Sequence, residues 1–378
     1  MGLYVVTAVL FLFSVAQFYD PETGFTRLIE FGSVFEETAP PTLQRVPHHV
    51  NEDSTGYDGQ FYALASIDPL LLDPATREVV GSYRARRTLF SMTAHVLGFG
   101  DPSRVIQIYA VQNVFTWLIF AVVVCRWLPP DSPQNFLRWL GCVFSYGMIS
   151  SARFALLDGP SVLLIALAVL AIETGRPYLA AAVAGLAGLT RETNVLIAGI
   201  VLPRQLREIT REALGGLLLR AGILLAPLTV WIAYVYTIDL VGLAGGSRNF
   251  ATPLSGYYEK WVETLEELHN EGWGSFARFN VYALVSLTTQ AVFLLVRPRP
   301  EHPWWRAGVP FVVLMAFLGE SVWAGYPGAT TRVVLPMSIA FNVLLPRGRW
   351  AWPLLLLGNL SVLHGFEAIR VPWLSSHV

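Results

Sequence analysis

Long apolar segments recur along almost the whole chain, with short polar turns between them. A helix that crosses a bilayer needs roughly 20 apolar residues, and fewer where the protein thins or re-enters the membrane. Inside a bilayer every backbone N–H and C=O must be paired within the protein, and an α-helix meets this requirement within one segment. The sequence therefore predicts an all-α, polytopic transmembrane protein, a single membrane domain over residues 1–378 with about eleven spans. We place them near residues 2–18, 104–125, 135–151, 160–174, 178–189, 193–203, 214–238, 277–296, 308–323, 332–345 and 350–365.

The charge content supports this class. Charged residues make up 14% of the chain, whereas a soluble protein carries about 25%, so most of the surface is expected to face lipid. The formal net charge of −1 argues against nucleic acid as a partner. Cys125 and Cys142, in or near predicted spans, form neither a disulfide framework nor a metal-binding spacing.

Two apolar segments allow alternatives. Residues 2–18 could be a signal peptide that ends at Ser14-Val15-Ala16, but no Lys or Arg precedes the apolar run, so we expect a retained first span. Residues 178–203 could be one helix, which would bury Arg191 and Glu192 at mid-membrane. We prefer two short helices that meet at Arg191-Glu192, because helices broken within the membrane are tolerated where they line a cavity.

Arginine-rich loops indicate the orientation. Short loops rich in basic residues stay in the cytoplasm, and placing these arginines there gives a consistent alternating path. Residues 19–103 then form a long first outer loop with interfacial helices, and residues 239–276 form a second outer loop. The arginines are Arg126, Arg138, Arg176, Arg204, Arg207, Arg211, Arg297, Arg299, Arg306, Arg347 and Arg349.

The first outer loop contains the hexapeptide Tyr57-Asp58-Gly59-Gln60-Phe61-Tyr62. Asp58 could be the N-cap of a helix that runs to about Ile67 and ends at Asp68-Pro69. Alternatively, Asp58 is a general base that takes the proton from an attacking sugar hydroxyl. In the second case Tyr57, Gln60 and Tyr62 would orient the substrate.

Three arginines follow in the same loop, in the run Tyr83-Arg84-Ala85-Arg86-Arg87. They could extend to lipid headgroups, or bind the phosphate of a lipid carrier, which guanidinium holds bidentately. Three arginines at an outer interface oppose the positive-inside trend, which favours a functional role. We take Arg84 and Arg87 as candidate ligands of a donor phosphate.

Four more polar residues reach the same outer side. Asp158 precedes Gly159-Pro160 and an apolar run, so it could serve only to start a helix. Arg191 and Glu192 lie within an apolar stretch, where ionised residues are costly and usually line a cavity; they could instead pair with neighbouring helices. Arg332 opens a late span as an anchor or a further phosphate ligand. We take Arg191 and Arg332 as phosphate ligands, and Asp158 and Glu192 as substrate-orienting residues.

Two further patterns are weaker. His48-His49 could bind a divalent metal with an outer acid, but an adjacent pair in a loop is a poor signal, so we assign no metal ligands and no cofactor. In the second outer loop a Gly-rich part, Gly242 to Ser247, precedes an amphipathic part with Tyr257 and Trp261 among glutamates. That part could lie on the membrane interface or form a wall of an acceptor groove.

In this order, the motifs resemble those of bacterial integral-membrane glycosyltransferases of the GT-C class, in particular poorly characterised members with a Tyr-Asp-Gly-Gln-Phe-Tyr loop. These enzymes take sugars from polyprenyl-phosphate carriers. The similarity extends over roughly residues 1–345, and each motif alone is short. The matching positions are Tyr57 to Tyr62 with Asp68-Pro69; Tyr83, Arg84, Arg86 and Arg87; Asp158 to Pro160; Leu189 to Thr193; and Arg332 with Pro336.

The resemblance implies a catalytic base at Asp58, because an acid in the first outer loop is the usual base of the class. Many members have two adjacent acids there, whereas this chain has Asp58 followed by Gly59. The implied reaction inverts the sugar and moves it from a polyprenyl-phosphate donor to a glycan or glycolipid acceptor, at the outer face of a bacterial inner membrane. A transporter or flippase of lipid-linked saccharides and a non-catalytic subunit of a polysaccharide assembly complex are the rival hypotheses. The flippase would predict internal repeats, and we see none.

Overall fold

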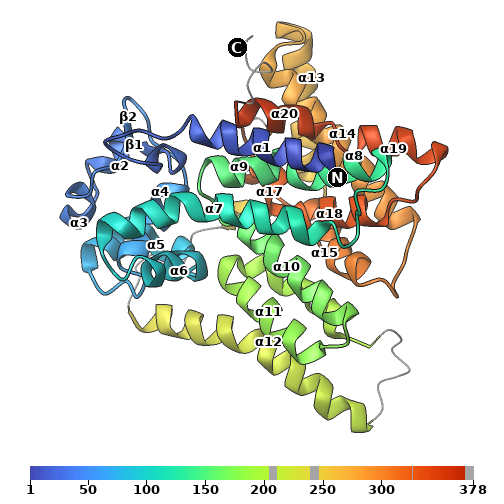
Figure 1. The fold of residues 1–378 in the computed structure, drawn as a ribbon, viewed down its shortest axis with the longest axis horizontal. Coiled ribbons are helices and arrows are strands. Elements are labelled where there is room, and N and C mark those ends of the chain that lie inside the picture. The colour runs from blue at the N-terminus through green and yellow to red at the C-terminus, as the bar shows by residue number, and fades with distance from the viewer. Residues whose placement is uncertain (204–210, 239–246, 326, 371–378) are drawn as a thin grey trace.

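A computed structural model describes residues 1–203, 211–238, 247–325 and 327–370. The chain is 72% helix and 2% strand, so the all-α prediction is confirmed at this level (Figure 1). The predicted Gly-rich part of the second outer loop lies, except for Ser247, outside the described residues, as do Arg204 and Arg207.

The predicted first outer loop is a folded unit at one end of the molecule, left in Figure 1. It has its own buried core, which includes Phe31, Leu43 and Tyr62. Its two short strands pair in parallel, with Phe31 opposite Val50. After α1 (Gly2–Ala16), its elements are η1 (Thr26–Leu28), β1 (Phe31–Gly32), α2 (Ser33–Glu36), α3 (Pro41–Gln44), β2 (Val50–Asn51), α4 (Gly59–Ile67), α5 (Pro74–Ala85) and α6 (Leu89–Leu97).

Helix α7 connects this unit to the helical bundle. It begins at Pro102, where the Asp101 side chain accepts a hydrogen bond from the Arg104 N–H, a typical N-cap. Its first half packs into the core of the outer unit through Tyr109, and its second half packs into the main core through Trp117. One rigid helix therefore fixes the outer unit relative to the bundle.

The rest of the chain forms that bundle. Helix α1 packs into the bundle core, where Phe11 stacks on Trp117 with ring centroids 3.9 Å apart. The elements are α7 (Pro102–Val124), α8 (Pro133–Val143), α9 (Tyr146–Arg153), α10 (Asp158–Glu173), α11 (Pro177–Thr190), η2 (Glu192–Val201), α12 (Arg211–Thr237), η4 (Ser247–Asn249), α13 (Ser255–Glu271), α14 (Ser275–Val296), α15 (Pro303–Phe317), α16 (Glu320–Trp323), α17 (Thr330–Val333), α18 (Leu335–Leu344), η5 (Arg349–Ala351), α19 (Trp352–Leu357) and α20 (Ser361–Ala368).

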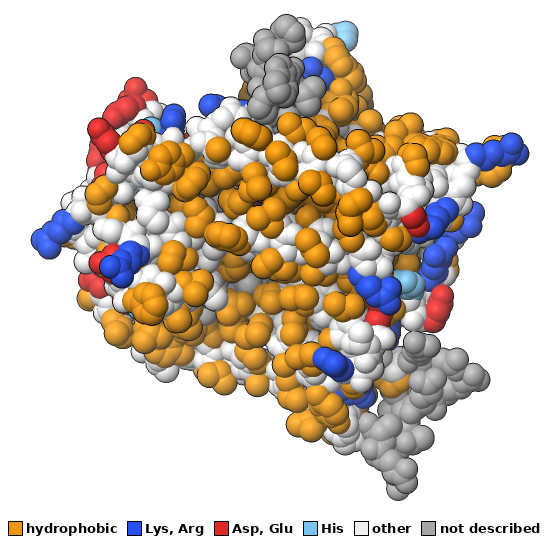
Figure 2. Space-filling view, in the orientation of Figure 1, with side chains coloured by type: hydrophobic (Ala, Val, Ile, Leu, Met, Phe, Trp, Pro, Cys, Tyr) orange, Lys and Arg blue, Asp and Glu red, His pale blue; other side chains and the backbone are white. Residues whose placement is uncertain are grey.

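Among the described residues three helices are long and apolar enough to cross a membrane: Pro102–Val124, Leu214–Thr237 and Phe276–Val296. Their outward faces carry apolar side chains such as Val122 (73% exposed) and Val230 (69% exposed). Figure 2 shows hydrophobic side chains across the middle of one face, with charged side chains mainly toward its left and right edges. This arrangement indicates a membrane protein.

The expected count of about eleven spans is not confirmed, because several predicted spans are broken. Residues 135–151 form α8 and α9, which are separated at Phe144-Ser145. Residues 332–345 divide at Val334, and residues 350–365 divide at Gly358 to Leu360. Predicted span 308–323 corresponds to a helix that starts earlier and ends at Phe317. Apolar composition does not reveal these breaks.

The predicted break at Arg191-Glu192 is confirmed. Helix α11 ends at Thr190 and the 3-10 helix η2 begins at Glu192, while Arg191 between them has extended backbone angles, φ −151° and ψ 127°. The chain therefore turns at the two charged residues, and both side chains line a cavity.

Candidate functional site

The hexapeptide forms the start of α4, which ends at Ile67 as predicted. A side chain at Gly59 is excluded, because a Cβ atom there would lie 2.2 Å from the carbonyl oxygen of Phe154 at the end of α9. Gln60 is buried and holds the neighbouring loop: its Oε1 accepts from Gly32 N–H and its Nε2 donates to the Thr55 carbonyl. Gln60 therefore holds the wall of the site through its amide, and its predicted part in orienting the substrate stays a prediction.

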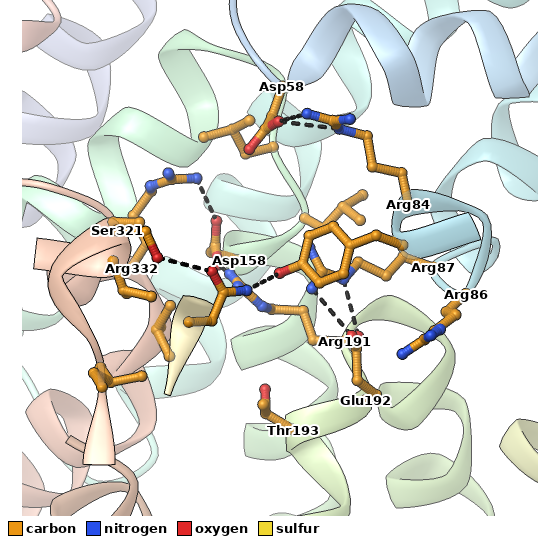
Figure 3. Close-up of a pocket in the computed structure, with 18 of the residues that line it drawn as sticks. Asp58, Arg84, Arg86, Arg87, Asp158, Arg191, Glu192, Thr193, Ser321 and Arg332 are labelled. Carbon is orange, nitrogen blue, oxygen red and sulfur yellow. Dashed lines mark hydrogen bonds and ion pairs between the residues drawn. The ribbon is translucent and has the colours of Figure 1, made fainter. Parts of the chain in front are cut away.

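Asp58 occupies the N-cap position of α4, but its carboxylate caps no backbone N–H. Instead it accepts two hydrogen bonds at Oδ1 from Arg84, 3.2 Å from Nε and 2.9 Å from Nη2. The capping interpretation of the side chain is therefore wrong. Figure 3 shows the carboxylate facing Arg84, and its side chain keeps 42% exposure toward the interior cavity space.

Two opposing effects set the pKa of Asp58. Desolvation of the carboxyl by the surrounding protein raises the pKa, and the positive charges of Arg84, Arg332 and Arg87 lower it. The charges win, so the pKa of Asp58 lies below its usual value. The group is thus an ionised carboxylate at neutral pH, open to the cavity and able to accept a proton.

Arg87 is held on both sides. Its Nε and Nη2 bind the two carboxylate oxygens of Glu192 at 2.9 and 3.1 Å, and its Nη1 donates to the Tyr62 hydroxyl at 2.9 Å. Only 8% of the Arg87 side chain is exposed. The Arg87–Glu192 pair joins the outer unit to the turn between α11 and η2. Arg87, Glu192 and Tyr62 therefore hold these two parts of the site together.

Asp158 lies between two arginines. Its side chain is 2% exposed and forms ion pairs with Arg191 and, at 3.4 Å, with Arg332. Arg332 also donates to the Tyr57 hydroxyl at 3.0 Å. Helix α10 starts at Asp158 as predicted, but the carboxylate caps no N–H. Its function in the fold is to hold two cations at one place.

Specific contacts place these groups. Tyr109 and Asn113 of α7 donate to the carbonyls of Ala155 and Leu156, which fixes the turn before Asp158. Gly147 lets α9 approach α17 closely, since a Cβ there would lie 2.3 Å from the Thr331 carbonyl. That approach fixes the backbone beside Arg332.

These side chains surround a cavity of about 400 Å³, which we call the arginine cavity. Its apolar part is lined by leucine and valine side chains from α15, α16, α17 and the 156–157 turn. Within the described residues, Arg191 Nε and Thr193 Oγ1 are buried without a hydrogen-bond partner. Its charged lining residues are Asp58, Arg84, Arg86, Arg87, Asp158, Arg191, Glu192 and Arg332.

A second cavity of about 740 Å³ lies beside it, and we call it the aromatic cavity. Its rings come from the hexapeptide and from the ends of α9: Tyr57, Phe61, Tyr146 and Phe154. The two cavities share part of their lining, and the shared residues are Asp58, Arg84, Ser321, Ala329 and Arg332. Asp58 therefore borders both cavities.

The structure brings eight of the ten predicted site residues to the arginine cavity or its shared wall, and the other two, Tyr57 and Gln60, to the aromatic cavity. Residues that the sequence did not indicate also line the arginine cavity. The Ser321 hydroxyl donates to the Asn249 side-chain oxygen, and the Asn249 side-chain N–H donates to the Tyr83 hydroxyl. Single Ser and Asn residues carry no sequence signal, whereas Tyr83 adjoins the arginine run.

The two weaker patterns have defined places. His48 contacts the Val46 carbonyl and the Glu36 carboxylate, and the described residues contain no group of three His, Cys, Asp or Glu that could hold a metal ion. The amphipathic segment forms α13, which packs on α16 and the following loop: Tyr257 contacts Trp323, and Lys260 donates to the Gly325 carbonyl. Gly325 lines the aromatic cavity, so α13 holds part of the wall of that cavity in place.

In three comparisons with known proteins, the chain matched no family model, no curated protein and no solved structure.

Proposed function

We propose that this protein is an inverting glycosyltransferase of GT-C-like architecture. It moves a sugar from a polyprenyl-phosphate donor to a glycan or glycolipid acceptor at the outer face of a bacterial inner membrane. The observation that carries the proposal is the position of Asp58, an exposed ionised carboxylate on the wall between an arginine-lined cavity and an aromatic one. The topology of about eleven spans, with residues 19–103 and 239–276 outside, belongs to the same proposal.

The arginine cavity suits the donor. A polyprenyl phosphate combines an anion with an apolar chain, and this cavity combines guanidinium groups with a lining of Leu156, Leu157, Leu314, Leu318, Val322 and Val333. Among the arginines of this cavity with a described ion pair, Arg84 is the most accessible, with 30% of its side chain exposed. Arg191 offers an unpartnered Nε. We assign phosphate binding to Arg84, Arg191 and Arg332, with Arg87 held by Glu192 as their support.

The reaction follows from these positions. Asp58 takes the proton of the acceptor hydroxyl as the oxygen bonds to C1 of the donor sugar. The C1–O bond to phosphate breaks, and its electron pair leaves with the polyprenyl phosphate. The arginines stabilise the charge on the leaving phosphate, so no cofactor is required. Direct displacement on the face opposite the phosphate inverts the anomeric centre.

The rival flippase would use the same arginines to move the carrier without chemistry. We favour the enzyme because Asp58 has no use in carrier movement that a neutral residue could not fill. A carboxylate beside a phosphate site repels the substrate, which is a cost that base catalysis explains. A non-catalytic subunit would likewise gain nothing from this exposed charge.

The test uses the purified protein in lipid nanodiscs and in proteoliposomes. Nanodiscs receive a panel of radiolabelled polyprenyl-phosphate sugars with a membrane glycan extract. The products are then separated, and the amounts of free polyprenyl phosphate and of labelled glycan are measured. We expect both products to appear together in equal amounts. Movement of intact donor across proteoliposomes without either product would replace the enzyme by the flippase. Tight donor binding with neither turnover nor movement would support the subunit.

A further inference from the structure

The two cavities differ in the charge of their walls. Arg86, Arg87, Arg191, Asp158 and Glu192 line only the arginine cavity. Among the described residues, the aspartate and arginines that line the aromatic cavity are Asp58, Arg84 and Arg332, all of them on the wall that the two cavities share. The remaining lining is aromatic, small or uncharged polar, apart from His364.

The hexapeptide divides the two spaces. Tyr57, Gln60 and Phe61 line the aromatic cavity, whereas Tyr62 lines the arginine cavity, and Asp58 lines both. Each shared arginine also lies over a ring of the motif. The Arg84 guanidinium carbon is 3.7 Å from the Phe61 ring centroid, and that of Arg332 is 5.3 Å from the Tyr57 centroid. The motif thus places an aromatic face on one side of the base and cations at its border.

The aromatic cavity is poorly suited to a second phosphate group. Its two arginines already bind Asp58 and Asp158, and both also reach the arginine cavity, where the donor phosphate would compete for them. Its rings are partly exposed although they lie inside the fold; Tyr57, for example, is 36% exposed. Aromatic rings with apolar faces and polar edges suit the C–H faces and hydroxyls of a sugar ring. A volume of about 740 Å³ lies within the range of about 300–1,000 Å³ that is typical of ligand sites.

We propose that the aromatic cavity is the acceptor site and that it takes an uncharged saccharide, whose attacking hydroxyl reaches Asp58 across the shared wall. This inference rests on the proposed transferase function and adds the acceptor class and its place. The donor and acceptor then approach Asp58 from opposite cavities, so the base lies beside the hydroxyl while the phosphate stays with the arginines.

The test fills each cavity separately. Ala324 and Ala368 line the aromatic cavity but not the arginine cavity, and neither is fully buried. Ala324→Trp and Ala368→Trp, on two different elements, should each occlude the aromatic cavity. Thr193 lines only the arginine cavity, so Thr193→Trp is the matched control.

The probes are neutral trisaccharides of glucose, galactose, mannose and arabinose, a trigalacturonate as the anionic sugar, and farnesyl phosphate. Saturation-transfer NMR on protein in nanodiscs measures binding.

We expect a neutral trisaccharide to bind the wild type at least about tenfold more tightly than trigalacturonate. Ala324→Trp and Ala368→Trp should each weaken trisaccharide binding by a similar factor and leave farnesyl phosphate binding unchanged. Thr193→Trp should weaken farnesyl phosphate binding and leave trisaccharide binding unchanged. Preference for trigalacturonate, failure of every neutral probe to bind, or unchanged sugar binding in both Ala324→Trp and Ala368→Trp would overturn the inference.

Failure of this inference can be separated from failure of the proposed function. If donor and acceptor are turned over but Ala324→Trp and Ala368→Trp both leave the KM for acceptor unchanged, the acceptor binds elsewhere. The proposed transferase function then stands. If saccharides bind in the aromatic cavity but no donor is ever cleaved, the site stands without the transferase.

Discussion

The ion pair between Arg87 and Glu192 should be a main stabilising link between the outer unit and the bundle, and its loss should be measurable. Arg87→Met removes the guanidinium and leaves the Glu192 carboxylate without its two hydrogen bonds. Breaking a buried ion pair costs about 3–5 kcal/mol. Because 24% of the Glu192 side chain is exposed, water relieves part of this cost, and we expect about 2–3 kcal/mol.

The corresponding shift in melting temperature is modest. A domain of 150–250 residues loses about 2–4 °C per kcal/mol, and this chain is longer, so the lower figure applies. Arg87→Met should therefore lower the Tm by about 4–6 °C. The double variant Arg87→Met with Glu192→Gln should recover part of the loss, because it leaves no uncompensated charge, with a coupling energy of about 1–3 kcal/mol.

The chain contains its own reporter for this assay. Cys142 is fully buried, so a thiol-reactive fluorophore labels it as the protein unfolds. Cys125→Ser removes the more accessible thiol and preserves a donor to the Ala121 carbonyl. A Tm for Arg87→Met within about 1 °C of the parent, or a double variant no more stable than the weaker single variant, would refute the stabilising role of the pair.

Three further outcomes follow from the same geometry. Asp58 works ionised and Arg84 lowers its pKa, so Arg84→Gln should move the acid limb of the kcat/KM profile to higher pH, while Arg86→Gln leaves that limb in place. Gly59→Ala forces α4 away from the Phe154 carbonyl and should cost about 1–3 kcal/mol; Gly215→Ala, in open space on α12, should not destabilise. NMR of the product should show an inverted anomeric configuration, and retention would exclude direct displacement.

Several features of the fold and the site could be predicted from the sequence because they depend on nearby residues alone. The charged pair Arg191-Glu192 is too expensive within a continuous apolar helix, so a break there was predictable. Asp58 stood out as a carboxylate in a specific polar motif of the outer loop. By contrast, the break at Phe144-Ser145 lies in an apolar stretch and gives no charge signal.

The pairing of charges could not be predicted from the sequence. Arg84 binds Asp58, whereas Arg87, three residues later, binds Glu192 in a distant segment. Tertiary packing decides which arginine meets which acid, and charge spacing along the chain does not encode it. The same holds for Gln60, whose amide binds the Gly32 N–H in β1 and the Thr55 carbonyl in the following loop.

The most direct test of the central claim compares transferase turnover of the wild type with that of Asp58→Asn in nanodiscs, with the donor that the panel identifies. Asn keeps the size of the side chain and an oxygen for Arg84 but cannot act as a base. Asp73→Asn is the matched control, because Asp73 caps α5 in the same outer unit and lines neither cavity. We predict a loss of about a hundredfold or more in Asp58→Asn and normal turnover in Asp73→Asn. Equal turnover in wild type and Asp58→Asn would contradict the account.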